Sequence, residues 1–248
     1  MDNITGFIVL ADISGYTKFV RSHNMKKIPF IGKQVTKTSE SHAEHIISDL
    51  LEKVIEELEG TLTVNKLQGD AVLFYSNPEN LDEYPKLLID KINGCFEVFI
   101  KRLNDIIFCE TCPCDACHQM GNLRLKSFVH YGDFLIKKVS RFEEIAGENV
   151  ILAHRLMKNS IDADEYILFT DSVKKICNFN YLGKVDERIE KCDGLGDVPI
   201  SVFYPEKKIL ENPAVDKMGV FSKFKAMNNY FKEIKNKKIL EEKYGFSS

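Results

Sequence analysis

Residues 7–17 of the chain read FIVLADISGYT, and the type of fold follows from this stretch. The apolar run from Gly6 to Asp12 has the length of a buried strand, and the Asp-Ile-Ser-Gly sequence after it is typical of a tight turn leading into a helix. We therefore expect the carboxylate of Asp12 at the carboxyl end of a strand. Because Asp12 interrupts the apolar run and no basic residues lead into it, we expect neither a signal peptide nor a membrane span here, and no later segment is long enough to span.

Working outward, the periodicity of apolar residues predicts an alternation of strands and helices. Residues 61–67 and 71–75 are rich in β-forming residues and flank Gln68-Gly69-Asp70, which predicts a hairpin with Asp70 at its bend. The expected elements are helices over 43–58, 88–103 and 147–158 and strands over 6–12, 61–67, 71–75, 123–131, 134–139, 166–170 and 198–204, with a turn at Gly132. This order predicts an α+β fold, a ferredoxin-like mixed or antiparallel sheet with helices packed on one face.

Composition limits the classes of function. The chain has 248 residues, 44% of them apolar, and a net charge of -3 from 34 basic and 37 acidic residues. A charge this small gives no general attraction to nucleic acid or to anionic lipid. The seven cysteines are too unevenly spread for the disulfide framework of a secreted protein, so we expect a cytoplasmic protein.

We divide the chain into a domain over residues 1–210 and a tail over 211–248. Apolar residues of the tail fall on one helical stripe, namely Val220, Phe224, Met227, Phe231 and Ile234. A stripe of this kind with many lysines between its members predicts an amphipathic helix. Packing on its own domain or on a partner subunit is the preferred interpretation, ahead of membrane binding.

Three stretches share one resemblance: residues 7–17, residues 66–70 (KLQGD) and residues 128–155 (FVHYGDFLIKKVSRFEEIAGENVILAHR). They resemble class III adenylate and guanylate cyclase domains, and more closely an uncharacterised bacterial family of cyclase-like proteins. The resemblance covers about residues 5–205. It implies the class III nucleotide cyclase fold, a purine nucleoside triphosphate as ligand, and a homodimer in which the metal-binding and the purine- or arginine-bearing groups come from opposite subunits.

The resemblance places the metal site at Asp12 and Asp70. Both carboxylates are expected at strand ends, where hard divalent cations such as Mg²⁺ or Mn²⁺ would find oxygen ligands, and the carbonyl of Ile13 is implied as a further ligand. Either aspartate alone is better explained by a structural role, Asp12 as a helix cap and Asp70 as a turn residue, whereas the two together favour metal binding.

The turn after the first strand is expected to hold the triphosphate. Its residues are Ile13, Ser14, Gly15, Tyr16 and Thr17. Backbone amides around a glycine and a following helix N-terminus can bind phosphate oxygens. The alternative is an ordinary connection between a strand and a helix.

Lys66 and Glu144 fall where the adenylate-specific members of the resembling family place a purine-binding lysine and aspartate. A cationic donor with a carboxylate acceptor suits adenine better than guanine, whose edge is reversed, so ATP is favoured over GTP. The alternative for both residues is an exposed charge.

Arg155 falls where the family has an arginine that stabilises phosphate charge during the reaction, and the alternative is a surface ion pair on the helix. One helical turn earlier the family has an asparagine that holds the ribose, and this chain has Ile151 instead. Since isoleucine donates no hydrogen bond, we expect poor orientation of the substrate. The neighbouring His154 is either a substitute for the asparagine or a bystander on the helix surface.

A cysteine-rich segment over residues 108–121 is expected to be a loop insertion. Its thiols follow the pattern Cys-x2-Cys-x-Cys-x2-Cys and are Cys109, Cys112, Cys114 and Cys117. Clustered thiolates in a reducing compartment bind Zn²⁺ most readily. A reduced or redox-active loop is the alternative.

Two functions therefore remain open from the sequence. The chain is either a weak or conditional enzyme that cyclises ATP to cyclic AMP as a homodimer, or a binding module of cyclase fold that senses nucleotide or acts through partners without turnover. A third and less favoured reading gives the functional role to the cysteine loop.

Overall fold

The structure is a computed structural model that describes residues 2–22, 32–109 and 120–206, together with residues 225 and 232. Its elements in chain order are β1 (Asp2–Ser14), α1 (Tyr16–Ser22), α2 (Gly32–Leu58), β2 (Thr63–Gln68), β3 (Ala71–Ser76), α3 (Tyr84–Cys109), η1 (Met120–Asn122), β4 (Arg124–Val139), β5 (Phe142–Ala146), α5 (Glu148–Leu156), β6 (Tyr166–Thr170), α6 (Asp171–Ile176), η2 (Asn180–Leu182), β7 (Val185–Cys192) and β8 (Gly196–Phe203).

The strands form one mixed sheet in the order β2-β3-β1-β4-β6-β8-β7, and β5 pairs with β4 outside this path. The pairing of β4 with β6 is parallel, whereas the other described pairs are antiparallel. The predicted α+β class and the mixed, largely antiparallel sheet are thus confirmed.

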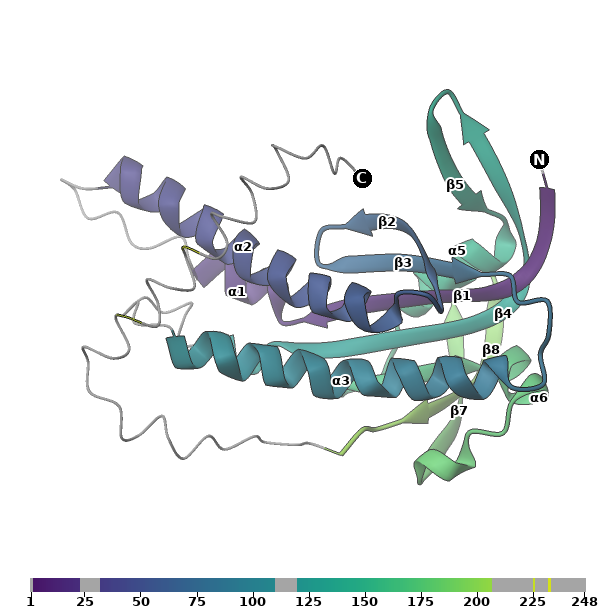
Figure 1. The fold of residues 1–248 in the computed structure, drawn as a ribbon. Coiled ribbons are helices and arrows are strands. Elements are labelled where there is room, and N and C mark those ends of the chain that lie inside the picture. Colours follow the sequence, from purple (N-terminus) through teal and green to yellow (C-terminus); the bar gives the residue numbers. More distant parts are fainter. Residues whose placement is uncertain (1, 23–31, 110–119, 207–224, 226–231, 233–248) are drawn as a thin grey trace.

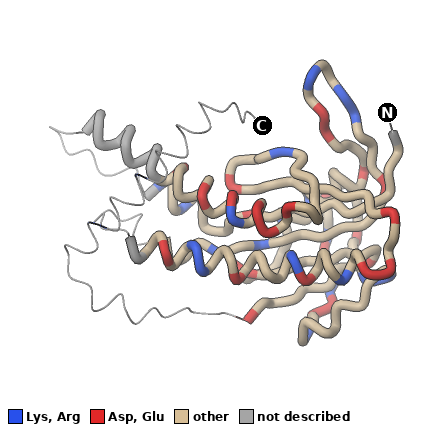
Figure 2. The backbone as a smooth tube through the Cα atoms, in the orientation of Figure 1, with Lys and Arg blue, Asp and Glu red and all other residues tan. Residues whose placement is uncertain are grey.

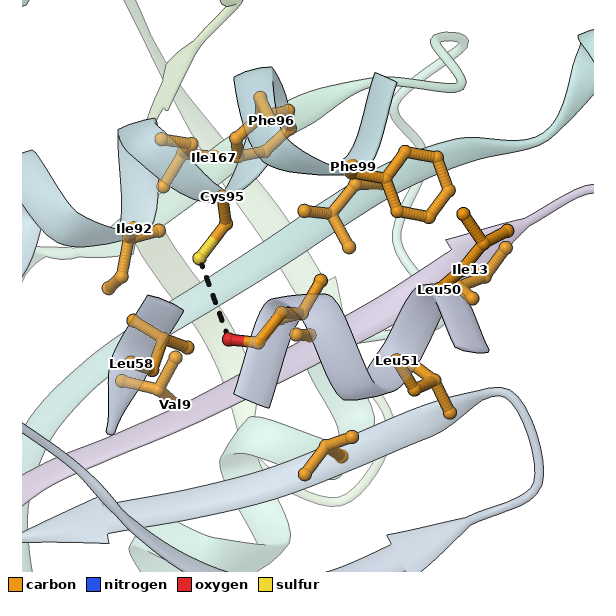
Figure 3. Close-up of a cluster of buried hydrophobic side chains, with 14 of the residues drawn as sticks. Val9, Ile13, Leu50, Leu51, Leu58, Ile92, Cys95, Phe96, Phe99 and Ile167 are labelled. Atoms are coloured by element: carbon orange, nitrogen blue, oxygen red, sulfur yellow. Dashed lines mark hydrogen bonds between the residues drawn. The ribbon is translucent and has the colours of Figure 1, made fainter. Parts of the chain in front are cut away.

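The central strand β1 is buried on both faces. Successive side chains of a strand point to opposite sides of the sheet, and those of β1 enter two separate cores. Phe7, Val9 and Ile13 belong to the larger core, beneath α2 and α3. These two helices lie side by side across the sheet (Figure 1). Figure 3 shows Val9 and Ile13 of β1 together with apolar side chains of both helices.

The helices α2 and α3 are also joined by polar contacts. The Arg102 guanidinium of α3 donates to both carboxylate oxygens of Asp49 in α2, at distances of 2.8 to 3.1 Å. Inside the interface, the Cys95 thiol lies 4.0 Å from the carbonyl oxygen of Val54 (Figure 3). The predicted helices over 43–58 and 88–103 are both present and both longer than expected.

The second face of the sheet carries a smaller core. Ile8 and Leu10 of β1 lie there with Val150, Ala153 and Leu156 of α5. The prediction that helices pack on one face therefore describes the two long helices, while the short helix α5 covers the opposite face. An amphipathic pattern predicts which side of a helix is buried but not which face of the sheet buries it.

The predicted turn at Gly132 is wrong. Strand β4 continues through Gly132, which stands opposite Gly6 of β1 in a ladder that runs from Asp2 and Ile136 to Ser14 and Arg124. A Cβ at Gly132 would lie 2.6 Å from the Asn149 amide nitrogen, so this glycine serves a close approach of α5 and not a turn. The hairpin is formed further on, between β4 and β5, and it projects from the sheet (Figure 1).

Two further differences concern short or polar elements. The helix α6 and the edge strand β7 were not expected from the sequence. Strand β7 reads VDERIEKC and offers no apolar run. Among the described residues, no helix combines the length and the apolar character needed to cross a bilayer. The predicted tail over 211–248 lies almost entirely outside the described residues.

We predict that Gly6→Ala destabilises the protein strongly. A Cβ at this position would lie 1.9 Å from the carbonyl oxygen of Ser76, so β1 or β3 must shift. The expected loss in the free energy of unfolding, measured by urea denaturation, is about 2–3 kcal/mol. Gly121→Ala is the matched control, because its Cβ would have its nearest neighbour at 4.0 Å, in ordinary contact. Equal losses in both variants would contradict the close approach at Gly6.

Candidate functional site

Asp12 stands near the carboxyl end of β1, as predicted. Its cross-strand neighbours are Ala71 of β3 on one side and Lys126 of β4 on the other. Because neighbours in an antiparallel ladder share a face, the side chains of Asp12 and Lys126 lie on the same face of the sheet. The alternation along β1 assigns this face to the core of Ile8 and Leu10.

Asp70 lies at the bend between β2 and β3, also as predicted. Gly69, with φ of 67°, takes the left-handed conformation that makes the bend possible. The backbone N–H of Ile13 donates to the carbonyl oxygen of Asp70 at 3.0 Å. This hydrogen bond fixes the residue after Asp12 against the bend and so holds the two aspartates at neighbouring positions.

Burial and nearby negative charge disfavour the ionised forms of both carboxylates. Burial, then repulsion from Asp70, raises the pKa of Asp12 to about 6, and the charge of Lys126 opposes this rise. The pKa of Asp70 is raised by burial and by the carboxylate of Glu44. A bound cation would stabilise the ionised forms of these two half-buried carboxylates.

The donor set fits Mg²⁺ or Mn²⁺. These ions take oxygen ligands and commonly use one or two protein carboxylates, with the other positions filled by water and substrate phosphates. Within the part of the chain that the structure describes, no group of three or more His, Cys, Asp or Glu side chains forms a metal cluster. Asp12 and Asp70 would therefore supply a partial coordination shell, to be completed by the ligand.

A cavity of about 940 Å³ opens beside the aspartates. It is lined by Asp12 and Asp70 and by all of the predicted phosphate-binding residues Ile13, Ser14, Gly15, Tyr16 and Thr17. Gly15, with φ of 91°, makes the turn into α1. The structure thus brings together the predicted metal site and the predicted triphosphate site.

The side chains of the turn are held by acidic partners. The Ser14 hydroxyl donates to Asp164 at 3.0 Å, and the Tyr16 hydroxyl donates to Glu44 at 2.8 Å. This bond to Glu44, together with burial, raises the pKa of Tyr16 to about 12. The side chains of Ser14 and Tyr16 are therefore engaged in anchoring the turn.

Three cations on the cavity wall are functional candidates that sequence reasoning missed. They are Lys18, Arg124 and Lys126. Lys126 lies directly across the ladder from Asp12, and its ammonium lies 5.3 Å from the centre of the Tyr166 ring. Only the register of β1 with β4 reveals this neighbour. A polar residue within an alternating strand is ordinary, so the sequence alone does not mark Lys126 as a functional residue.

Lys66 and Glu144, the predicted purine-binding pair, meet each other. The Lys66 ammonium lies 3.6 Å from a carboxylate oxygen of Glu144, with Lys66 on β2 and Glu144 on β5. Burial and the charge of Lys66 lower the pKa of His154 on α5. None of these three is among the described residues that line the cavity beside Asp12.

Arg155 also lies apart from that cavity within one chain. It is an exposed residue of α5 whose guanidinium pairs with Asp193 at 3.1 Å, beyond the end of β7. Ile151, one turn earlier, is 53% exposed. Both residues thus lie on the solvent side of α5, while Val150 and Ala153 are buried.

Most of the predicted zinc ligands belong to a segment that the structure does not describe. Cys112, Cys114 and Cys117 lie outside the described residues. Cys109 ends α3, and only its backbone is described.

The sequence of residues 47–166 matches a family described as "Protein of unknown function (DUF2652)". This range contains Asp70 and Lys126 but not Asp12. The Uncharacterized protein Rv2561/Rv2562 of Mycobacterium tuberculosis (strain ATCC 25618 / H37Rv) is 35% identical over 127 residues. The match covers 51% of this chain and 58% of that protein, so the chain spans little more than half of the length of this relative.

Several solved structures share the fold. The guanylate cyclase domain of RhGC from Catenaria anguillulae, in complex with GTP, has a TM-score of 0.56 at 14% identity, covering 83% of this chain and 100% of that one. The adenylyl cyclase CyaB from P. aeruginosa has a TM-score of 0.55 at 13% identity, covering 82% of this chain and 95% of that one. The guanylyl cyclase Cya2 has a TM-score of 0.56 at 12% identity, covering 84% of this chain and 96% of that one. The chain therefore has the fold of the class III adenylyl and guanylyl cyclase domains, and at these identities the likeness is one of fold alone.

We predict that Asp12→Asn changes how the free energy of unfolding depends on pH. The folded chain holds the Asp12 proton up to about pH 6, while the unfolded chain releases it near 3.8. The folded state therefore binds more protons in this window, and wild-type stability falls as pH rises through it. In chelator, Asp12→Asn should gain stability relative to wild type between pH 4 and 7, by about 2 kcal/mol.

Asp105→Asn, on the exposed side of α3, is the control for this isosteric change and should give no such gain. A loss of stability in Asp12→Asn at pH 7 would mean that the surroundings favour the charged form of Asp12.

Proposed function

We propose that this chain binds a purine nucleoside triphosphate together with Mg²⁺ or Mn²⁺, and that a homodimer cyclises ATP to cyclic AMP at a low rate. The observation that carries the proposal is the meeting of Asp12, Asp70 and the Gly15 turn at one cavity. A helix cap or a turn residue would account for either aspartate singly, but neither role requires the second aspartate beside it. The repulsion of Asp12 by Asp70 is unfavourable unless a cation is bound.

The metal would be held by the carboxylates of Asp12 and Asp70. A bound divalent cation would neutralise charge on the phosphate oxygens and on the attacking oxygen. The rest of the chemistry falls to the chain itself, which must bind the triphosphate, orient the ribose and keep the reacting atoms in line.

The triphosphate would lie between the Gly15 turn and the cations of the cavity wall. Lys18, Arg124 and Lys126 bring positive charge to a cavity that otherwise carries several carboxylates. The N-terminus of α1 adds backbone N–H groups, which suit phosphate oxygens. The hydrogen bonds from Ser14 and Tyr16 would keep the turn in place when the ligand enters.

The proposal of a homodimer is supported by the groups that one chain keeps apart. The pair Lys66 and Glu144 and the residue Arg155 lie outside the cavity of their own chain. Lys66, Glu144 and Arg155 each keep more than a third of their side-chain surface exposed, so they are accessible to a second copy. In a dimer of the family type, these residues would face the cavity of the partner, where Lys66 and Glu144 would read adenine.

Cyclisation requires the ribose 3′-oxygen to form a bond to the α-phosphorus while the bond from that phosphorus to pyrophosphate breaks and the 3′-proton leaves. An oriented ribose is essential to this in-line geometry. Ile151 occupies the position from which the family's asparagine would hold the ribose, and its side chain is exposed and apolar. The proposed rate is therefore low.

The second candidate is a binding module without turnover. It is favoured by Ile151 and by the ion pair of Arg155 with Asp193, which occupies the guanidinium in the described state of the chain. Nucleotide and metal binding are common to both candidates, so the first test concerns binding and the second concerns turnover.

We predict that Asp12→Ala and Asp70→Ala each lose the Mn²⁺-dependent binding of a non-hydrolysable ATP analogue in titration calorimetry. Each variant removes one of two carboxylates, and the expected loss of affinity is about tenfold or more. Asp186→Ala, on the edge strand β7, is the control and should bind as the wild type does. The matching GTP analogue should bind more weakly to the wild type. Undiminished binding by both aspartate variants would place the site elsewhere in the chain.

We predict that Ile151→Asn raises the turnover of ATP to cyclic AMP with Mn²⁺, by up to roughly a hundredfold, since an oriented polar contact made in the transition state has about that effect. GTP should gain less. The assay must run at protein concentrations at which a dimer is shown to form. Ile151→Leu is the matched control and should not gain.

High activity in the wild type would mean that another group, such as His154, already orients the ribose. Nucleotide binding without any turnover in either form would establish the binding module instead.

A further inference from the structure

A second hollow lies on the other side of the cavity wall, along the outer side of α3. It has a volume of about 490 Å³, and α3 contributes Phe96, Ile100 and Ile107 to its apolar lining. Ile107 is 38% exposed, so part of this apolar lining faces solvent. We call this hollow the α3 groove.

The described chain runs directly into the α3 groove at its end. Strand β8 ends at Phe203, and the following Pro205 and Glu206 line the groove together with Phe203 itself. Another 42 residues, 207–248, continue from this point. The continuing chain therefore starts at the groove and needs no long path to reach its lining.

The sequence of the tail is complementary to the groove. Its stripe of apolar residues, from Val220 to Ile234, is suited to cover the apolar lining of the groove. Residues 207–248 hold ten lysines and five acidic residues, a net charge of +5, whereas residues 1–206 carry the remaining −8 of the total of −3. The charged residues of the groove lining are the acidic Glu97, Glu165 and Glu206 and the basic Arg124, so acidic side chains outnumber basic ones there. In Figure 2, acidic and basic residues are interspersed along the rest of the described backbone.

We propose that the segment 213–240 of the tail docks its apolar stripe in the α3 groove of its own chain. The proposal commits to the chain's own tail because the tether keeps the segment at a high effective concentration beside the groove. Its lysines would meet the acidic residues of the groove lining, and its stripe would cover Ile100 and Ile107. Burial of such a stripe is the main favourable term in the association of an amphipathic segment with a protein.

A fluorescent reporter can test this in the full chain, because the sequence contains no tryptophan. Phe224→Trp places one tryptophan on the stripe of the tail. In the docked state the emission maximum of this tryptophan should be shifted to the blue relative to the same protein in urea. The wavelength of the maximum should not change over a wide dilution series. Amide hydrogen exchange of residues 220–234 should be slowed in the same samples.

The groove variants are Ile107→Lys and, independently, Glu97→Lys. Each should move the emission of the reporter most of the way towards that of the unfolded protein and remove the protection of residues 220–234. Asp105→Lys is the matched control, since Asp105 lies on the exposed side of the same helix, outside the groove, and the substitution has the charge change of Glu97→Lys. It should leave the emission unchanged. Circular dichroism checks that all the variants remain folded.

Four results would overturn the proposal. A reporter with the emission of an exposed tryptophan in the wild-type background would mean that the tail does not dock. A blue-shifted emission that both groove variants leave unchanged would place the tail on another surface. An emission that moves to the red on dilution would mean that a second copy supplies the groove, and a blue shift that appears only with anionic vesicles would assign the tail to membranes.

Discussion

The double pairing of β1 is the constraint on which the rest of the structure depends. This strand is hydrogen-bonded to β3 on one edge and to β4 on the other, and both of its faces are buried. A strand held from four sides has no freedom to shift by a residue, because a slip would turn every side chain to the wrong face. Asp12, at the end of this strand, inherits that rigidity.

The rigidity of β1 matters because the candidate site is electrostatically unfavourable on its own. Burying Asp12 beside Asp70 opposes ionisation of both groups, and the fold must supply the free energy that keeps them together. The ladder from β3 through β1 to β4 and the hydrogen bond between Ile13 and Asp70 provide this support. Functional sites in many proteins contain such locally unfavourable arrangements, which the surrounding structure tolerates because it is overdetermined.

The sequence was sufficient to predict the elements with a strong local pattern. The apolar run before Asp12, the helical spacing from Ala43 to Leu58 and the hairpin around Gly69 all appear in the structure. The failures share a physical cause, which is that long-range pairing decides them. Glycine often marks a turn, whereas Gly132 admits the approach of Asn149 from α5. Lys126 was missed for the same reason, since its place beside Asp12 exists only in the register of two strands that are more than a hundred residues apart.

The cavity and the α3 groove share part of one wall, formed by Arg124, Glu165 and Pro205. Two binding sites with common walls are thermodynamically coupled whenever an occupant of one changes the positions of those residues. Linkage then requires the effect to be equal in both directions: whatever the groove's occupant does to the affinity of the cavity, a ligand in the cavity does to the affinity of the groove. The groove at the end of β8 and the candidate nucleotide site are thus placed so that the occupancy of one can change the affinity of the other.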